Sequence, residues 1–386
     1  MPVILALAAA AFLSTIVMRM TDPIMPLIGG DLGIESSTVA LLASAYAVPY
    51  GVFQLVWGPL GDRHGKLKVA RIAVIGLGLT IVATALAPGF GPMLAARFLS
   101  GMIGGAIIPL GLATIGDCIA IDKRQAFLSR FMVAVILGSI TGGVLTGILA
   151  DHLPWRMVLA GYGAATLAVG VGLALLRLAD SPNPAFSLNP TALGARYVEI
   201  GSRPASRRLL AVVFVEGLLV FGIVPFISPY LHEIRGASFT EIGVVIACFG
   251  LGGIVFSLAV NRLLGWLGPS GGLRFGGLML GLMPVLFLFE MPLPGYGLVW
   301  LATGFGFYYF HNTLQLRATE MAPEARGSAF SLFAFAFFVG QGIGPTLAGA
   351  LVGSLGYAGT IALAGAGLAG LGLVATRVIR VGGTSG

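Results

Sequence analysis

Long apolar runs separated by short polar segments dominate this 386-residue chain. A helix needs roughly 20 apolar residues to cross the hydrocarbon layer of a bilayer, which is about 30 Å thick. Dividing the chain by runs of that length predicts twelve transmembrane helices. They are expected near residues 3–29, 37–60, 70–88, 91–117, 126–151, 157–179, 207–232, 240–263, 272–291, 296–318, 325–353 and 357–377.

One long polar connection follows the sixth apolar run and divides the runs six and six. It extends from Asp180 to Arg208 and is rich in proline. We expect a bundle of six helices over residues 1–180, a cytoplasmic linker over 181–206 with a short surface helix near 191–200, and a second bundle over 207–386. The predicted fold is therefore an all-α integral membrane protein with two six-helix bundles.

Charged residues are few and unevenly placed. Asp, Glu, Lys and Arg make up 10% of the chain, whereas a soluble domain carries about 25%. If the N-terminus is cytoplasmic, 18 of the 22 Lys and Arg residues fall in inner loops or the tail, and the exceptions are Arg19, Arg97, Arg156 and Arg235. We therefore expect a multi-pass protein of a bacterial inner membrane with both termini in the cytoplasm. The net charge of +7 is attributed to this orientation and not to nucleic-acid binding.

The two halves of the chain also resemble each other. The segment from Asp117 to Phe127 aligns with the segment from Glu320 to Phe330, and the same offset places residues 138–142 on 341–345. Parallel repeats of this kind enclose a substrate site near the middle of the membrane in one class of transporters.

A polar turn between the second and third predicted helices carries a recognisable motif, GPLGDRHGKLK over residues 58–68. We expect Gly58 and Gly61 to allow close approach of backbones, and Gly65 to adopt a positive φ. The pattern G-x-x-x-D-R-x-G-K-x-K resembles the signature loop of the major facilitator superfamily; an ordinary cytoplasmic loop with basic bias is the alternative. The resemblance implies a gating role for Gly58, Asp62, Arg63, Gly65 and Lys66.

The fourth predicted helix contains RFLSGMIGGA over residues 97–106, which resembles a second motif of this superfamily. A cation inside hydrocarbon must be paired or hydrated, so Arg97 should face the protein interior. Arg19 and Asp22 lie three residues apart and share one helical face, and Asp22 lies at a depth similar to that of Arg97. Because the first and fourth helices line the cavity in this superfamily, we predict a cluster of Arg19, Asp22 and Arg97 that binds protons or substrate. The alternative is a static ion pair that joins two helices.

The second half offers a comparable pair, Glu216 and His311. They lie at similar distances from the inner ends of the seventh and tenth predicted helices and are expected to meet. Histidine changes its charge near neutral pH, which suits proton coupling, although a histidine that only donates a hydrogen bond is the alternative. Aromatic and amide side chains nearby suit an amphipathic organic ligand. The predicted substrate-cavity residues are Tyr46, Tyr50, Gln54, Tyr308, Tyr309, Asn312, Gln315 and Gln341.

Glycines recur along the fifth and eleventh predicted helices, at 138, 142, 143 and 147 and at 340, 344 and 349. Such spacing predicts flat faces for close helix packing. The segment from Gly340 to Pro345 is similar to the glycine-proline motif of antiporters, but in that family the motif belongs to the fifth helix. This chain has Gly143 where the fifth-helix proline is expected, so the resemblance puts exchange, as opposed to uptake, in question.

Charged residues at the inner ends of the fourth and tenth predicted helices resemble, together with Asp62 and Arg63, the charge relay that holds the bundles together in an outward-open transporter. The second copy of the signature loop has Asn261-Arg262 in place of Asp-Arg and is expected to lack an acidic latch. The remaining residues of the predicted relay are Asp117, Arg124, Glu320 and Arg326.

The sequence contains no phosphate-binding loop, zinc-ligand spacing or nucleophile motif, so we expect neither an enzyme nor a cofactor or metal site. The resemblance, strongest to bacterial drug:proton antiporters, implies a monomeric, proton-coupled secondary transporter that exports a small organic molecule by alternating access. Uptake of a small organic anion together with protons is the first alternative, suggested by Arg19 and Arg97. A polytopic receptor that binds a ligand without transporting it is the second.

Overall fold

The computed structural model describes residues 2–176 and 189–379, and within them the chain is almost entirely helical. The first helices are α1 (Pro2–Arg19), α2 (Met25–Leu32), α3 (Ser36–Val39), α4 (Leu41–His64), α5 (Lys66–Leu86), α6 (Phe90–Gly104), α7 (Ile107–Cys118), α8 (Ile121–Ala150) and α9 (Trp155–Leu175). The helices after the linker are α10 (Pro190–Ser202), α11 (Pro204–Pro229), α12 (Phe239–Val285), α13 (Leu293–Ala318) and α14 (Arg326–Val378). A π-helical turn, Tyr230–Ile234, follows α11.

Nine helical segments in the described residues are long and apolar enough to cross a membrane, and the shorter α1 is apolar as well. Two of the nine, Phe239–Val260 and Gly271–Leu288, lie in α12, the second continuing into the 3₁₀ turn Leu286–Leu288 that follows it. Helix α14 runs for 53 residues but is interrupted at Gly356, where φ is +67°. The count of candidate spans therefore does not by itself reach the predicted twelve.

Two predicted helices are broken in the structure. The first predicted span, residues 3–29, ends as a helix at Arg19, turns over residues 20–24 and resumes as α2. The fourth, residues 91–117, divides between Gly104 and Ile107 into α6 and α7.

The predicted surface helix in the linker is confirmed as α10. Its first turn is capped by the side chain of Asn189, which accepts hydrogen bonds from the amides of Thr191 and Ala192, and Pro190 occupies the first helical position. The beginning of the predicted linker, residues 181–188, lies outside the described residues.

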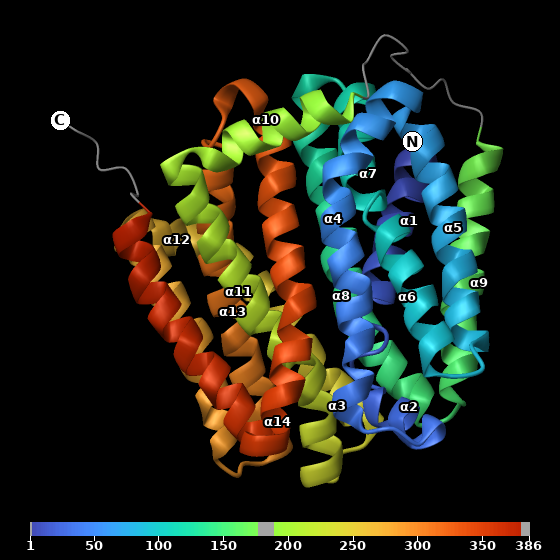
Figure 1. Ribbon diagram of the computed structural model, residues 1–386, viewed down its shortest axis with the longest axis vertical. Coiled ribbons are helices and arrows are strands. Elements are labelled where there is room, and N and C mark those ends of the chain that lie inside the picture. The colour runs from blue at the N-terminus through green and yellow to red at the C-terminus, as the bar shows by residue number, and fades with distance from the viewer. Residues whose placement is uncertain (1, 177–188, 380–386) are drawn as a thin grey trace.

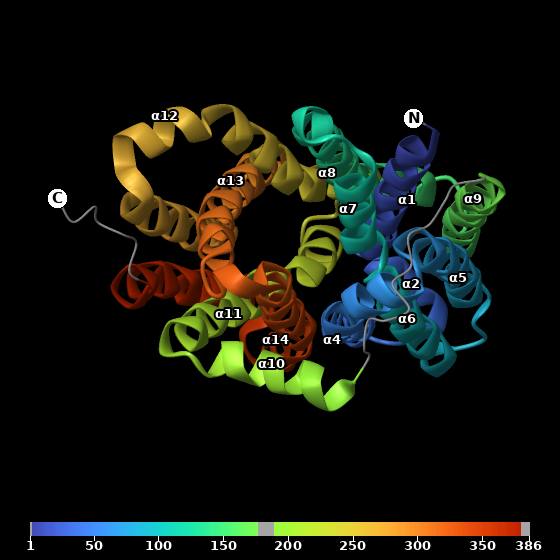
Figure 2. The same cartoon turned by 90° about the horizontal axis from the view of Figure 1, so that it is seen from above.

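The helices run roughly along one direction, with α10 across one end of the molecule and α2 and α3 at the other (Figure 1). We call these the α10 end and the α2–α3 end. Viewed along the helices, α1–α9 lie on one side and α11–α14 on the other, with α4 beside α14 and α8 beside α12 (Figure 2).

Glycines bring these helices into direct backbone contact. A Cβ atom added to Gly138 or Gly147 would collide with the backbone of Phe12 or Phe239, and one added to Gly340 with that of Phe214. The predicted glycine faces are therefore confirmed: the α8 face packs on both α1 and α12, and the α14 face packs on α11. Contacts of this type suit a lipid environment, in which apolar surfaces alone give little drive for association.

Hydrogen bonds join the two sides at the α2–α3 end. Asp151, which follows α8, accepts bonds from the backbone amides of Phe239 (3.1 Å) and Thr240 (2.9 Å) and from the Thr240 hydroxyl (2.6 Å). Ser228 donates to the carbonyl oxygen of Pro23 at 2.7 Å. Asp151 thus caps the N-terminus of α12 from the other side of the molecule.

Burial would raise the pKa of Asp151, but the hydrogen bonds from Thr240 and Phe239 outweigh it and hold the pKa below the ordinary value of 3.8. The stabilisation that the charged form gives is therefore complete above the ordinary pKa of 3.8, and it is lost as the pH falls from there through the lowered pKa of the folded state.

We expect Gly101→Ala to lower the stability of the purified protein. The added methyl group would collide with the Tyr46 backbone, and overpacking of this kind costs about 1–3 kcal/mol. The measurement is the apparent melting temperature in detergent. Gly172→Ala is the matched control, because nothing lies within 4 Å of the added atom; equal melting temperatures for the two variants would contradict the packing described.

We expect Asp151→Asn to loosen closure at the α2–α3 end. Charge-assisted hydrogen bonds contribute about 1.5–3 kcal/mol, so labelling of a cysteine introduced at Ser37 should accelerate about 10- to 150-fold. The background carries Cys118→Ser and Cys248→Ser. Asp31→Asn is the control, because Asp31 pairs with Arg156 on its own side at 3.4 Å.

Both labelling rates rise with pH as the introduced thiol ionises. Their ratio, Asp151→Asn over wild type, should stay constant between about pH 5 and 8, because the lowered pKa keeps Asp151 charged over that interval. A labelling rate equal to wild type, or a difference that disappears within this interval, would argue against the contact as a latch.

Candidate functional site

A cavity of about 610 Å³ lies between the two sides of the molecule. Helices α1, α8, α11, α12, α13 and α14 contribute its walls, which are mostly apolar and aromatic. Six residues predicted to bind protons or substrate line it: Arg19, Tyr308, His311, Asn312, Gln315 and Gln341.

Four other predicted cavity residues are not among the described residues that line it. Tyr309 is one step further along α13 than Tyr308, which rotates it by about 100°; it packs instead against Phe256, with ring centroids 5.3 Å apart. Tyr309 therefore does not line this cavity, whose α13 face follows the spacing 308, 311, 312, 315.

The α4 residues face other helices. Tyr46 and Tyr50 stack on each other at 5.8 Å and are almost fully buried. Gln54 donates a hydrogen bond to the carbonyl oxygen of Gly105 at 3.2 Å. These side chains hold α4 against α6 and its continuation, and they do not line this cavity.

The predicted cluster of Arg19, Asp22 and Arg97 is brought together. Arg19 Nη1 lies 3.5 Å from Asp22 Oδ2. Arg97 is completely buried; it donates to the carbonyl oxygen of Val17 at 3.0 Å, and its guanidinium lies 4.5 Å over the Tyr46 ring. Asp22 also interacts electrostatically with the charge of Arg97.

This cluster has spare hydrogen-bonding capacity. Asp22 Oδ2 and the Nε and Nη2 atoms of Arg97 are buried without a hydrogen-bond partner among the described residues. Buried polar atoms without partners are costly and are often found where a group binds or moves. The arrangement can therefore accept a proton or a change of partner.

The second predicted pair also meets. His311 Nδ1 lies 2.9 Å from Glu216 Oε2, and Glu216 is fully buried. Its other oxygen, Oε1, has no hydrogen-bond partner among the described residues. The His311 ring stacks on Phe307, with centroids 5.1 Å apart.

The two pairs share one arrangement. In each, a basic side chain reaches the cavity while its acidic partner is enclosed behind it: the side-chain exposures are 16% for Arg19 against 3% for Asp22, and 15% for His311 against 0% for Glu216. A molecule in the cavity thus contacts the bases directly and the carboxylates only through them.

At the α10 end, Lys66 joins two acids of the predicted gating loop region. Its Nζ lies 3.5 Å from Asp62 Oδ1 and 2.7 Å from Asp117 Oδ2. Gly65 adopts φ +96° between α4 and α5, as predicted. A Cβ added to Gly61 would collide with the side chain of Leu110 and not with a backbone, so the neighbour differs from the predicted one.

Other parts of the predicted relay differ. Nothing lies within 4 Å of a Cβ atom added to Gly58, so its expected close approach is absent from the described residues. Arg124 bonds to the carbonyl oxygen of Ile119 on its own segment. Arg63 and Arg326 form no ion pair with a described residue.

The sequence reasoning missed several ion pairs, two of which involve acids near the predicted relay. Glu320 pairs with Arg317 at 2.7 Å, a contact that their three-residue spacing could have suggested. Glu324 pairs with Arg203 of the linker at 2.7 Å, which no local spacing could have indicated.

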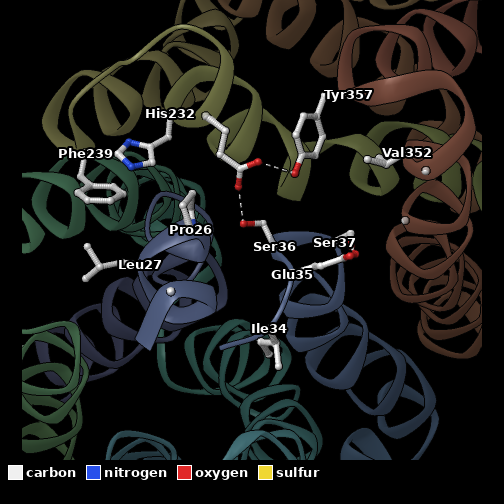
Figure 3. Close-up of a pocket in the computed structure, with 14 residues that line it drawn as sticks. Pro26, Leu27, Ile34, Glu35, Ser36, Ser37, His232, Phe239, Val352 and Tyr357 are labelled. Atoms are coloured by element: carbon white, nitrogen blue, oxygen red, sulfur yellow. Dashed lines mark hydrogen bonds between the residues drawn. The ribbon is translucent and has the colours of Figure 1, made fainter. Parts of the chain in front are cut away.

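A second cavity, of about 680 Å³, opens between the two sides at the α2–α3 end. The side chains of Ser36 and Tyr357 point toward the carboxylate between them in Figure 3; this carboxylate, Glu233, accepts bonds from Ser36 at 2.6 Å and from Tyr357 at 2.9 Å. Sequence reasoning did not identify this cavity. A glutamate near the end of a helix was the available signal, but its partners are more than a hundred residues away in sequence.

The sequence and the structure resemble those of known transporters, not enzymes. The chain is 26% identical to the "Multi-drug resistance efflux pump PmrA homolog" of Lactococcus lactis subsp. lactis (strain IL1403) over 366 residues, 88% of this chain and 85% of the relative. It is 25% identical to the "Inner membrane transport protein YdhP" of Escherichia coli (strain K12), over 91% of this chain and 89% of the relative.

Among solved structures, the fold resembles a bacterial homologue of the human lysosomal transporter Spinster in an inward-facing, unoccupied conformation. The TM-score is 0.76 with 17% identity, over 98% of this chain and 95% of the other. The human organic anion transporter MFSD10 aligns with a TM-score of 0.71 and 17% identity, over 98% and 99%. Both likenesses concern the fold.

The family model described as Major Facilitator Superfamily matches residues 7–340 and 209–383, and so covers nearly the whole chain. Together with the apolar helices, this match indicates a multi-pass membrane protein that transports small molecules. The chain belongs to the major facilitator superfamily.

Proposed function

We propose that this protein is a proton-coupled secondary transporter that exports a small organic molecule by alternating access. The observation that carries the proposal is the cavity between the two sides, with one acid–base pair from each side at its wall. Relatives named as efflux pumps support export.

The proposed topology has twelve spans in two bundles of six, with both termini in the cytoplasm of a bacterial cell. A straight helix of 53 residues such as α14 would be about 80 Å long, far more than a bilayer thickness of about 30 Å. We therefore propose that α14 crosses the membrane twice and turns at Gly356. In α12, the two candidate spans provide two further crossings.

Alternating access requires that the two sides separate at one end while they close at the other. The bonds of Asp151 and Glu233 hold the α2–α3 end closed, and these exposed contacts would break for the molecule to open there. We infer that the described conformation is closed at the α2–α3 end.

Coupling follows if protonation changes the relative stability of the two conformations. A proton on Asp22 would leave Arg19 and Arg97 without a countercharge, and a proton shared by Glu216 and His311 would alter the second pair. Such a change drives transport only if the proton binds the two conformations with different affinity.

Proton-coupled uptake of a small organic anion is the second candidate, and Arg19 on the cavity wall supports it. An anion bound to Arg19 would draw the guanidinium away from Asp22. The buried carboxylate would then favour its protonated form, so that anion and proton bind together, as symport requires.

Proteoliposomes that contain the purified protein and an internal pH indicator distinguish the two candidates. We expect exchange, so that entry of a transported dye or drug makes the lumen more alkaline as protons leave. Acidification on entry of a carboxylate would favour symport instead. Substrate flux without any proton movement would exclude proton coupling.

We expect Asp22→Asn to reduce proton-driven flux at least about 10-fold, equivalent to roughly 1.4 kcal/mol, because the site can no longer change its charge. Exchange of labelled for unlabelled substrate without a proton gradient should persist, which shows that the variant is folded. Asp31→Asn, which alters an exposed pair with Arg156, should retain both activities. Proton-driven flux at the wild-type level in Asp22→Asn would remove Asp22 from the mechanism.

A further inference from the structure

The charges at the wall of the central cavity all have one sign. Among the described residues that line it, Arg19 carries a permanent positive charge, His311 is basic, and none is Asp or Glu. The nearest acids, Asp22 and Glu216, are enclosed behind these two bases. An organic cation in the cavity would therefore meet the Arg19 guanidinium without direct access to a carboxylate.

Aromatic rings connect the two bases. The Arg19 guanidinium lies 4.5 Å over the ring of Phe221, and Phe221 contacts Phe307 edge-to-face with centroids 5.5 Å apart. Phe307 in turn stacks on His311 at 5.1 Å. Phe337 closes the group, at 5.5 Å from Phe221 and 4.6 Å from His311. We call Phe221, Phe307 and Phe337 the phenylalanine cluster.

We propose that the central cavity binds an amphipathic aromatic anion, with its negative group on Arg19 and its ring system against the phenylalanine cluster. The proposal rests on the proposed function in one respect, that this cavity is the transport site, and it holds for export and for uptake alike. It names the class of substrate, which neither direction of transport determines.

The chemistry of the wall fits this class of ligand. Arg19 offers several N–H donors in a planar fork that suits a carboxylate or sulfonate. The amides of Asn312, Gln315 and Gln341 can bond to further polar atoms, and a cavity of about 610 Å³ has room for a molecule of two or three rings. Of the described lining groups, Arg19 alone combines permanent charge with contact to the cluster.

Three probes with the same ring system test the proposal: 2-naphthoate, 2-naphthamide and 2-naphthylmethylammonium. Binding to the full-length protein in nanodiscs of zwitterionic lipid is measured by isothermal titration calorimetry at neutral pH. We expect naphthoate to bind at least about 10-fold more tightly than the amide, and the ammonium probe to bind most weakly.

Variants of the protein test which residue causes the preference for the anion. Arg19→Gln alone leaves Asp22 buried with fewer countercharges, so the double variant Arg19→Gln/Asp22→Asn, which removes both charges, serves as the main test. It should bind naphthoate and the amide with similar affinity and keep the affinity of wild type for the amide. Arg274→Gln is the control for loss of one cation, since Arg274 is exposed and outside the cavity, and it should keep the full preference for the anion.

Three results would overturn the proposal: binding of the ammonium probe as tight as that of naphthoate, no measurable binding of any probe, or an unchanged anion preference in the double variant. These results are distinguishable from failure of the proposed function. Proton-coupled flux of neutral or cationic dyes without an anion preference would contradict the proposed substrate class but not the proposed transport. Tight naphthoate binding without flux of any substrate would contradict the proposed transport but not the binding of anions.

Discussion

The guanidinium of Arg97 is enclosed between α1, α4 and α6, and its burial determines much of the surrounding structure. A cation in a low-dielectric interior is destabilising by several kcal/mol unless donors and countercharges compensate it. The Val17 carbonyl, the face of Tyr46 and the charge of Asp22 provide that compensation. The Val17 carbonyl is free to accept the bond because α1 ends at Arg19, since the last four carbonyls of a helix lack partners within it.

The break after Arg19 therefore provides a hydrogen-bond acceptor for Arg97. A helix continued from α1 into α2 would keep the Val17 carbonyl within its own hydrogen-bond ladder, and Arg97 would lose an acceptor. The turn over residues 20–24 also places Asp22, whose amide bonds to the Arg19 carbonyl at 3.0 Å, beside both arginines. In the second half no such break is needed at Glu216, because His311 satisfies one of its oxygens directly within two continuous helices.

Sequence reasoning reached the features that depend on composition and spacing. It predicted the apolar runs, the linker helix α10, the glycine faces and the two acid–base groups, because lipid exposure, close packing and buried charge each leave a local pattern. It failed where a tertiary partner decides. The break at Arg19 follows from Arg97, some eighty residues away. The buried side chain of Tyr309 points away from the cavity because it packs against Phe256 of α12.

The charge relay shows the same limit. A motif identifies which residues are charged at the α10 end, but Lys66 bridges Asp62 and Asp117 only because α5 begins beside the end of α7. By sequence, Arg124 is an equally good candidate to pair with these acids. In the structure it donates a hydrogen bond to the backbone carbonyl oxygen of Ile119 instead. Choice among several nearby cations is thus a property of helix packing and not of the motif.

The contacts between the two sides differ in kind from those within each side. Each buried ion pair lies within one side, whereas the sides meet through packing of α8 on α12 and of α4 on α14. A few hydrogen bonds add to this packing at the α2–α3 end, where Asp151 and Glu233 accept and Ser228 donates. A typical hydrogen bond contributes about 0.5–1.5 kcal/mol net. Closure by a small number of such bonds is reversible at ordinary temperature. Each ion pair thus belongs to one side, and its base, Arg19 or His311, faces the cavity that the two sides share.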